Sequence, residues 1–368
     1  MQTNRRNWLR QMGLALAGIG LAPVKDLALP PAATPVHRKP GDLPIRLSSN
    51  ENPYGPSPMA RIAMAEGVLT SNRYNWQLSS DLVSAIAVKN SVSDDNILLG
   101  AGSTEILDLV VRFSAVKQGS FILADPTYGY WTDMAQAMGL KKIAVPLTAD
   151  KRHDLPAMLS AIAPDTRLIY VCNPNNPTGT ICEREALTAF IQEATKKTMV
   201  LVDEAYIDFT TQQSMAGLVI GNKNLIIAKT FSKIYGMAGA RTGYAIAHAS
   251  TIEQLSKLQV WANGSISVAS ASGALASLKD QDFVRTTYMS NEKARKYTIE
   301  QLERLKIFCI PSYSNFIYFS LSDYKPDFFE RLKTNNIIGT RIYEENGKWS
   351  RITVGTMEEM EKFISALG

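Results

Sequence analysis

The chain has 368 residues, of which 45% are hydrophobic and 20% charged, and its formal net charge is +5. This length and apolar content predict a large core in two domains, or in one large domain with a lobe. Residues 1–33 contribute a net +3 and the rest of the chain only +2. The main body therefore lacks the basic surface typical of a nucleic-acid-binding protein.

The cysteines and histidines exclude two further classes of site. Cys172, Cys182 and Cys309 give an odd number without metal-ligand spacing, which argues against a disulfide framework. The three histidines are scattered along the chain. We therefore expect no metal site, and we expect proton transfer, if any, to use another kind of side chain.

Residues 1–33 have the pattern of a signal peptide. The paired arginines Arg5 and Arg6 precede an apolar run, residues 12–22, that is too short to span a bilayer comfortably. Residues 5–10 follow the twin-arginine pattern, and the small residues near Ala33 are a candidate cleavage site. We expect export to the periplasm and no other membrane association. The alternative is an N-terminal helix in a cytoplasmic protein.

The chain from residue 34 to about 276 predicts an irregular arm followed by alternating helices and strands. The arm is rich in turn-forming residues, and we expect a helix at 59–69 after it. Apolar strands that alternate with helices indicate an α/β fold, with a mostly parallel sheet covered by helices on both faces. Further helices are expected at 80–90 and 103–115, and strands within 96–102, 119–126, 141–147, 166–174, 198–206, 224–231 and 242–247.

The pattern changes near residue 277. A long charged helix at 281–305 precedes two strand-like segments, 315–321 and 350–355, with a short helix between them and a last helix from Met357. These elements predict a smaller α+β lobe. The expected organisation is therefore an arm with part of the small lobe at 34–75, a large domain at 76–276 and the small C-terminal lobe at 277–368.

Polar motifs follow several predicted strands, at the sheet edge where ligands bind in open α/β folds. Ser103 and Thr104 open a helix after a glycine-rich turn, and a helix N-terminus suits a phosphate. Alone, that motif also fits a plain capped turn. Residues 173–179, "NPNNPTG", form a polar loop with more asparagine and proline than a turn needs.

The remaining motifs concern a carboxylate and a lysine. Asp203 ends an apolar strand shortly before Tyr206, and a buried carboxylate is costly unless it has a cationic partner. Lys233 lies between Ser232 and Ile234, with Arg241 eight residues on. A salt bridge and a surface lysine would explain these residues singly. Together with the phosphate motif they predict a pyridoxal phosphate (PLP) site, which needs a lysine for a Schiff base and an acid for the ring nitrogen.

With these motifs in order, the chain resembles the fold type I PLP-dependent aminotransferases and, within them, the histidinol-phosphate aminotransferase family. The resemblance runs from about residue 47 to the C-terminus and includes "NENPYGPSP", "GAGSTE", "DPTYGYW", "VDEAYIDF", "KTFSKIYGMAGARTGY" and "RITVGTMEEME". It implies that Lys233 forms the Schiff base and moves a proton, with Asp203 on the ring nitrogen and Tyr206 on the phenolic oxygen.

The resemblance also implies the other contacts. Arg351 is expected to bind the substrate carboxylate or phosphate, with Arg341 assisting and Tyr54 closing over the substrate. Tyr74 is expected to reach the cofactor phosphate of the neighbouring subunit, which implies a homodimer. The remaining cofactor-binding residues are Asn176 on the phenolic oxygen, Tyr128 on the ring, and Ser103, Thr104, Ser232 and Arg241 on the phosphate.

The implied reaction is amino-group transfer between a small amine donor and a 2-oxo acid. The resemblance makes histidinol phosphate the first expected donor and 2-oxoglutarate the first expected acceptor. Export would separate the enzyme from histidine synthesis, so aromatic or general amino acids are an alternative. A threonine-phosphate decarboxylase-like enzyme is a second alternative, because it shares most of these motifs. A third, a binding or regulatory protein with a degenerate site, is opposed by the intact Lys233, Asp203 and Arg241.

Overall fold

The computed structural model describes residues 43–324 and 326–368. The segment expected to be a signal peptide and the first part of the arm lie outside the described residues. The division into arm, large domain and small lobe stays a prediction.

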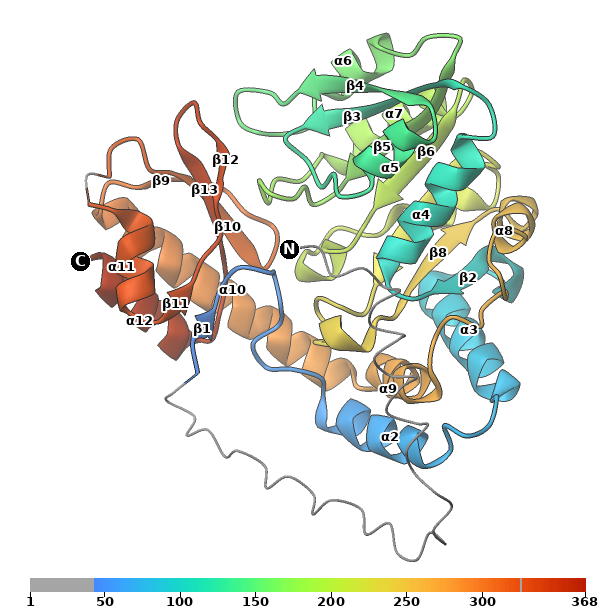
Figure 1. The fold of residues 1–368 in the computed structure, drawn as a ribbon, viewed down its shortest axis with the longest axis horizontal. Coiled ribbons are helices and arrows are strands. Elements are labelled where there is room, and N and C mark those ends of the chain that lie inside the picture. Colours follow the sequence, from blue (N-terminus) through green and yellow to red (C-terminus); the bar gives the residue numbers. More distant parts are fainter. Residues whose placement is uncertain (1–42, 325) are drawn as a thin grey trace, which may run out of the picture. The chain divides into compact units, whose positions relative to one another are not determined.

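The main sheet has seven strands in the order β2-β8-β7-β6-β5-β3-β4, and only β8 runs antiparallel to its neighbours (Figure 1). The prediction of a mostly parallel sheet is therefore confirmed, and each expected strand is present. Their bounds are β2 (Ile97–Gly100), β3 (Gly119–Asp125), β4 (Leu140–Pro146), β5 (Thr166–Cys172), β6 (Met199–Asp203), β7 (Leu225–Thr230) and β8 (Gly243–Ala247).

Helices cover both faces of this sheet, because its strands are apolar on both sides. One face packs against α3 (Trp76–Asn90), α6 (Leu155–Ser160) and α7 (Arg184–Ala194). The other face packs against α4 (Ser103–Ser114), α5 (Thr132–Ala137) and α8 (Ala249–Ser256). The central strands β5, β6 and β7 are buried apart from the half-buried Arg167 and Met199 near their starts. Polar residues such as Asp203 at their carboxyl ends are therefore buried polar groups next to an apolar core.

The C-terminal part has its own core. Its antiparallel sheet has the order β12-β13-β10-β9, and α10 (Gln281–Arg304), α11 (Phe328–Thr334) and α12 (Met357–Leu367) pack around it (Figure 1). The strands are β9 (Phe308–Ile310), β10 (Phe316–Ser320), β12 (Ile342–Glu344) and β13 (Trp349–Thr353). Short strands β9 and β12 were not expected from the sequence, since three residues carry no readable alternation.

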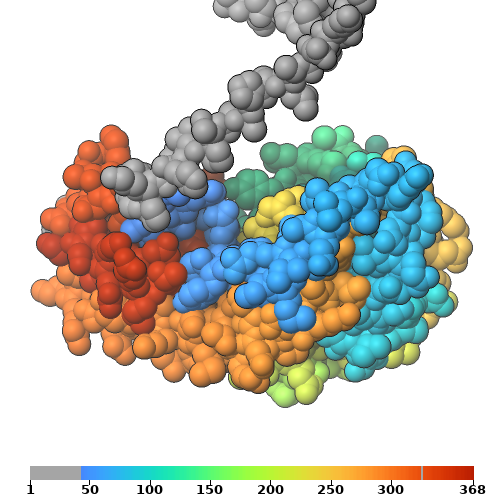
Figure 2. Space-filling model, turned by 90° about the horizontal axis from the view of Figure 1, so that it is seen from below, coloured from blue at the N-terminus to red at the C-terminus, as the bar shows by residue number. Residues whose placement is uncertain are grey.

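The described part of the arm contacts both cores. Strand β1 (Ile45–Arg46) pairs in parallel with β11 (Ile337–Ile338), and α2 (Pro58–Leu69) packs on α9 (Val268–Lys279). Figure 2 shows this blue segment passing from the red C-terminal elements, along the orange α9–α10 region, to the cyan α3. No helix among the described residues is both long and apolar enough to cross a membrane.

Candidate active site

A cavity of about 240 Å³ lies at the carboxyl ends of the central strands. Nine of the ten residues predicted to hold the cofactor line it, although they come from six separate segments of the chain. They are Ser103, Thr104, Tyr128, Asn176, Asp203, Tyr206, Ser232, Lys233 and Arg241.

Lys233 lies in the turn after β7, partly shielded from solvent. Its ammonium group donates to the carbonyl oxygen of Ser49 at 3.4 Å and lies 5.5 Å from the ring centre of Tyr206. Burial and then the positive charge of Arg351 lower the pKa of Lys233 to about 8. A lysine with this pKa is substantially neutral at mildly alkaline pH, as a nucleophile must be.

Asp203 ends β6 and is 3% exposed. Its carboxylate accepts hydrogen bonds from the Tyr170 hydroxyl at 2.9 Å and from the Ala205 N–H at 3.0 Å. Burial raises the pKa of Asp203, although both hydrogen bonds oppose that effect. A cationic ring nitrogen in the cavity would stabilise this carboxylate, so the residue fits the predicted partner of a pyridinium.

The Tyr206 hydroxyl accepts from two asparagine side chains, Asn50 at 3.0 Å and Asn176 at 3.3 Å. Burial raises the pKa of this phenol, so Tyr206 remains protonated and can donate to an oxygen in the cavity. Burial likewise raises the pKa of Tyr128 to about 12.

Ser103, Thr104, Ser232 and Arg241 form what we call the anion cradle. Ser103 and Thr104 begin α4, whose preceding residue Gly102 supplies no side-chain cap, so the first N–H groups of the helix remain available for an anion. Arg241 donates to the hydroxyls of Thr104 and Ser232, each at 3.4 Å. Gly102 has a φ of +76°, and a Cβ there would lie 2.2 Å from Arg241 Nη2, so a side chain at this position would be strained and would displace the guanidinium. The cradle fits a phosphate monoester.

Arg351 connects the small sheet to this site. The guanidinium donates to Asn176 Oδ1 at 2.5 Å and to the Ser48 carbonyl at 2.7 Å, and the residue is 7% exposed. Its buried Nε has no hydrogen-bond partner among the residues that the structure describes. A buried guanidinium at the site is suited to gripping an anion with two parallel hydrogen bonds.

Three predicted residues lie away from the cavity. Tyr74 is 75% exposed and contacts Trp76 and Trp261 instead. Arg341 is exposed and lies over the Tyr343 ring at 5.3 Å, a ring that Arg351 also contacts at 5.3 Å. Tyr54 lies outside the cavity, beside a small gap between the arm, Phe209 and α10. The roles predicted for these three residues stay predictions.

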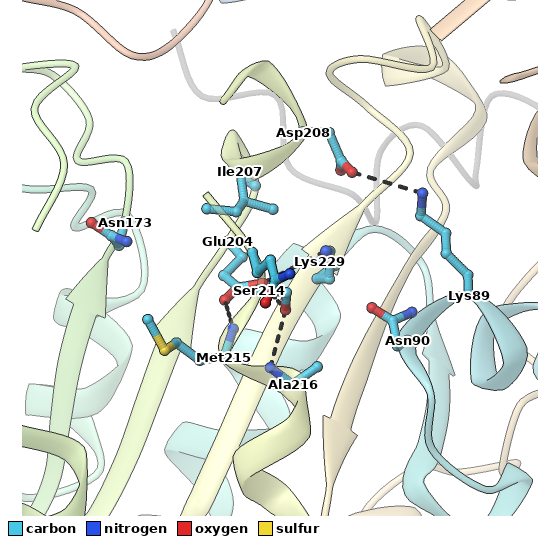
Figure 3. Close-up of polar contacts among 12 residues, drawn as sticks. Lys89, Asn90, Asn173, Glu204, Ile207, Asp208, Ser214, Met215, Ala216 and Lys229 are labelled. Atoms are coloured by element: carbon cyan, nitrogen blue, oxygen red, sulfur yellow. Dashed lines mark hydrogen bonds and ion pairs between the residues drawn. The ribbon is translucent and has the colours of Figure 1, made fainter. Parts of the chain in front are cut away.

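The carboxylate next to Asp203 points away from the cavity. Glu204 accepts from the Met215 N–H at 2.7 Å and from Ser214, and it pairs with the buried Lys229 ammonium at 3.6 Å (Figure 3). Burial opposes the charge on Lys229, but Asp208, Tyr244 and Glu204 together raise its pKa. The Glu204–Lys229 ion pair connects the residue that follows β6 to β7, the strand that precedes Lys233. It thereby holds the carboxyl ends of β6 and β7 together.

Sequence reasoning did not single out Asn50 or Tyr170. Tyr170 lies within an apolar strand two residues before its end, where a tyrosine is also an ordinary core residue. Asn50 lies in the turn-rich arm, and its contact with Tyr206 spans 156 positions of sequence. Only the "SSNENP" motif could have indicated it.

The family model described as "Aminotransferase class I and II" matches residues 44–367. The chain belongs to this family. Among curated aminotransferases, the histidinol-phosphate aminotransferase of Moorella thermoacetica is 37% identical over 328 residues, covering 88% of this chain and 84% of that protein. Histidinol-phosphate aminotransferase 2 of Nitrosospira multiformis is 33% identical over 327 residues, covering 88% and 83%.

A solved aminotransferase structure also matches. It is the histidinol-phosphate aminotransferase from Sinorhizobium meliloti in complex with pyridoxal-5'-phosphate. The two chains have a TM-score of 0.81 and 26% sequence identity, and the match covers 88% of this chain and 90% of that one. The fold type I prediction is confirmed.

Proposed function

We propose that this aminotransferase binds PLP and converts histidinol phosphate and 2-oxoglutarate to imidazole acetol phosphate and glutamate. The observation that carries the proposal is the position of Lys233, a lysine of lowered pKa in one cavity with a buried acid and an anion cradle. The names of the curated relatives, at 33% and 37% identity over most of the chain, support the substrate.

Bound PLP would supply an aldehyde that condenses with amines and a ring that stores electrons. Lys233 would hold it and then move a proton at the substrate α-carbon. Asp203 would keep the ring nitrogen protonated, and Tyr206 with Asn176 would bind the phenolic oxygen. Arg351 would exchange its contact with Asn176 for an anionic group of the substrate. The anion cradle would orient the phosphate of the cofactor.

The cofactor part is tested by adding PLP to the purified protein. We expect visible absorption that borohydride fixes at Lys233, and we expect Lys233→Ala to lose it. Histidinol phosphate should then change the absorption and 2-oxoglutarate restore it. Arg351→Ala should raise KM for acidic substrates strongly, because a bidentate contact is lost. Unchanged half-reactions in Arg351→Ala would contradict the substrate assignment.

The two enzymatic alternatives give different products. An aminotransferase of aromatic or general amino acids would turn those donors over and leave histidinol phosphate unused. A decarboxylase would release carbon dioxide without requiring a 2-oxo acid.

We also propose a homodimer in which Tyr74 reaches the partner's cofactor phosphate. Tyr74 is exposed and outside the cavity of its own chain, beside Trp76 and Trp261, which are 52% and 47% exposed. Such an aromatic cluster suits an interface core. Light scattering that gives the mass of one chain would contradict it.

Export through the twin-arginine route is a separate proposal, which the Arg5-Arg6 pattern supports. Fractionation of cells that express the full chain tests it, with lysine in place of both arginines as the control. Equal recovery of both forms in the cytoplasm would contradict export.

A further inference from the structure

The arm places one carboxylate at the wall of the cavity. Glu51 lines the same cavity as Lys233 and Asp203, and its side chain is 36% exposed. Burial and Arg351 lower the pKa of Lys233, whereas Asp203 and then Glu51 oppose this, so the Glu51 charge acts on the site. The proposed reaction leaves this residue without a role.

The backbone on either side explains how Glu51 reaches the cavity. The Ser48 carbonyl accepts from Arg351, and the Ser49 carbonyl accepts from Lys233. The Asn50 side chain donates to Tyr206, and Asn315 donates to the carbonyls of Asn50 and Glu51. The stretch 48–51 is therefore held against the site at each residue, and the position of Glu51 is fixed by buried contacts.

The carboxylate keeps acceptor capacity for a ligand. Within residues 43–324 and 326–368, its one ion pair is to Arg46, at 3.3 Å between Oε1 and Nη2, and that arginine side chain is 62% exposed. Such an exposed pair contributes little and is screened by salt. The second carboxylate oxygen, Oε2, makes no hydrogen bond to these residues.

A carboxylate in this place discriminates between substrate side chains. When a substrate covers Glu51, the carboxylate loses water, and a hydrocarbon ring returns no hydrogen bond for that loss. The N–H of a neutral imidazole would donate a hydrogen bond to the Glu51 carboxylate in place of that water. A protonated imidazole would donate a charge-assisted hydrogen bond. The wall of the cavity therefore favours a ring that carries an N–H donor.

We propose that Glu51 is a specificity-determining residue that accepts a hydrogen bond from the ring N–H of an imidazole-bearing substrate. The inference rests on the proposed function and deepens it, because it assigns the choice between histidinol phosphate and aromatic donors to one side chain. Arg351 recognises the anion, and Glu51 recognises the ring.

The test compares two substrates that differ only in the ring, histidinol phosphate and phenylalaninol phosphate. The kcat/KM of the PLP-loaded enzyme is measured for both, with 2-oxoglutarate as acceptor. Glu51→Gln keeps the shape and removes the charge. Gln still offers an accepting oxygen, so the ring N–H would keep a neutral hydrogen bond in place of a charge-assisted one. We therefore expect kcat/KM for histidinol phosphate to fall by about 10-fold. The value for phenylalaninol phosphate should stay nearly unchanged.

Arg46→Gln is the matched control, because it removes the ion pair and leaves the carboxylate. It should keep the preference of the wild type between the two rings. An equal loss on both substrates in Glu51→Gln would overturn the inference, since it would indicate a role in holding the arm. An equal change of preference in Arg46→Gln would overturn it as well.

A second substrate pair separates this inference from the proposed function. Histidine and phenylalanine differ in the same rings and carry no phosphate. If the wild type uses neither phosphate ester, the proposed substrate is wrong, and the ratio for the two amino acids then tests Glu51. The quantity compared is kcat/KM for histidine divided by kcat/KM for phenylalanine. If this ratio is the same in the wild type and in Glu51→Gln, the inference is overturned. If it is lower in Glu51→Gln than in the wild type, the inference is supported.

Discussion

Replacing Lys233 with methionine should stabilise the protein in the absence of PLP, in a pH-dependent way. The pKa of Lys233 falls from its ordinary value of 10.5 to about 8 on folding. At 1.36 kcal/mol per pKa unit, this fall of about 2.5 units means that the charged lysine costs the folded state at most about 3–4 kcal/mol at neutral pH. Methionine has a similar length and carries no charge, so Lys233→Met removes this cost.

The sign of the pH dependence follows from proton binding. Between about pH 8 and pH 10.5 the unfolded chain holds a proton on Lys233 that the folded protein has lost. The stability of the wild type therefore rises with pH across this window. The advantage of Lys233→Met should be full below pH 8 and should shrink toward zero as the pH approaches 10.5.

Urea unfolding of the PLP-free proteins at several pH values between 6.5 and 10.5 measures this difference. Lys197→Met, at an exposed position, is the control, and its difference from the wild type should not vary in this window. A constant difference for Lys233→Met, or a variant less stable than the wild type at pH 7, would refute the reasoning about the lowered pKa.

Two further substitutions test the supports of the site. Gly102→Ala should weaken PLP binding and cost about 1–2 kcal/mol of stability, because φ at Gly102 is +76° and the new Cβ would meet Arg241. Gly239→Ala is the control. A Cβ at Gly239 would have no atom within 4 Å, so this variant should change neither PLP binding nor stability. Equal PLP dissociation constants and melting temperatures for the two alanine variants would contradict this. Glu204→Gln should cost about 2–4 kcal/mol in urea unfolding, because it removes the ion pair of the buried Lys229 and leaves the Asp208 charge, outside ion-pair distance, as its remaining carboxylate. A loss below about 1 kcal/mol would indicate that water reaches this pair.

The sequence predicted most of the secondary structure because the signals for it are local. The apolar runs at 166–172 and 199–203 are buried strands, and the charged helix expected at 281–305 is α10 (Gln281–Arg304). Short strands such as β9 (Phe308–Ile310) were not predicted, because their formation depends on pairing with a neighbouring strand, here β10. Helix α9 (Val268–Lys279) was not predicted either. Its small residues pack against α2 and do not form the apolar stripe by which an amphipathic helix is recognised.

The candidate site divides in the same way. By itself, the sequence determined which chemical groups stand at strand ends, since a buried strand that stops at Asp203 or shortly before Lys233 already limits where those side chains can lie. It did not determine which of two adjacent carboxylates faces the cavity. Tertiary contacts decided that, because Tyr170 binds Asp203 while Lys229 and the Met215 N–H hold Glu204 on the other side of the strand.

Only the tertiary structure brought the arm and the small sheet to the cavity. Arg351 contacts Asn176 across 175 positions, and Asn50 contacts Tyr206 across 156. Contacts over such separations depend on how the two cores pack and leave no periodic trace in the sequence. The chemistry of the site was thus readable from the chain, whereas its geometry, and the place of Glu51 at its wall, came from packing.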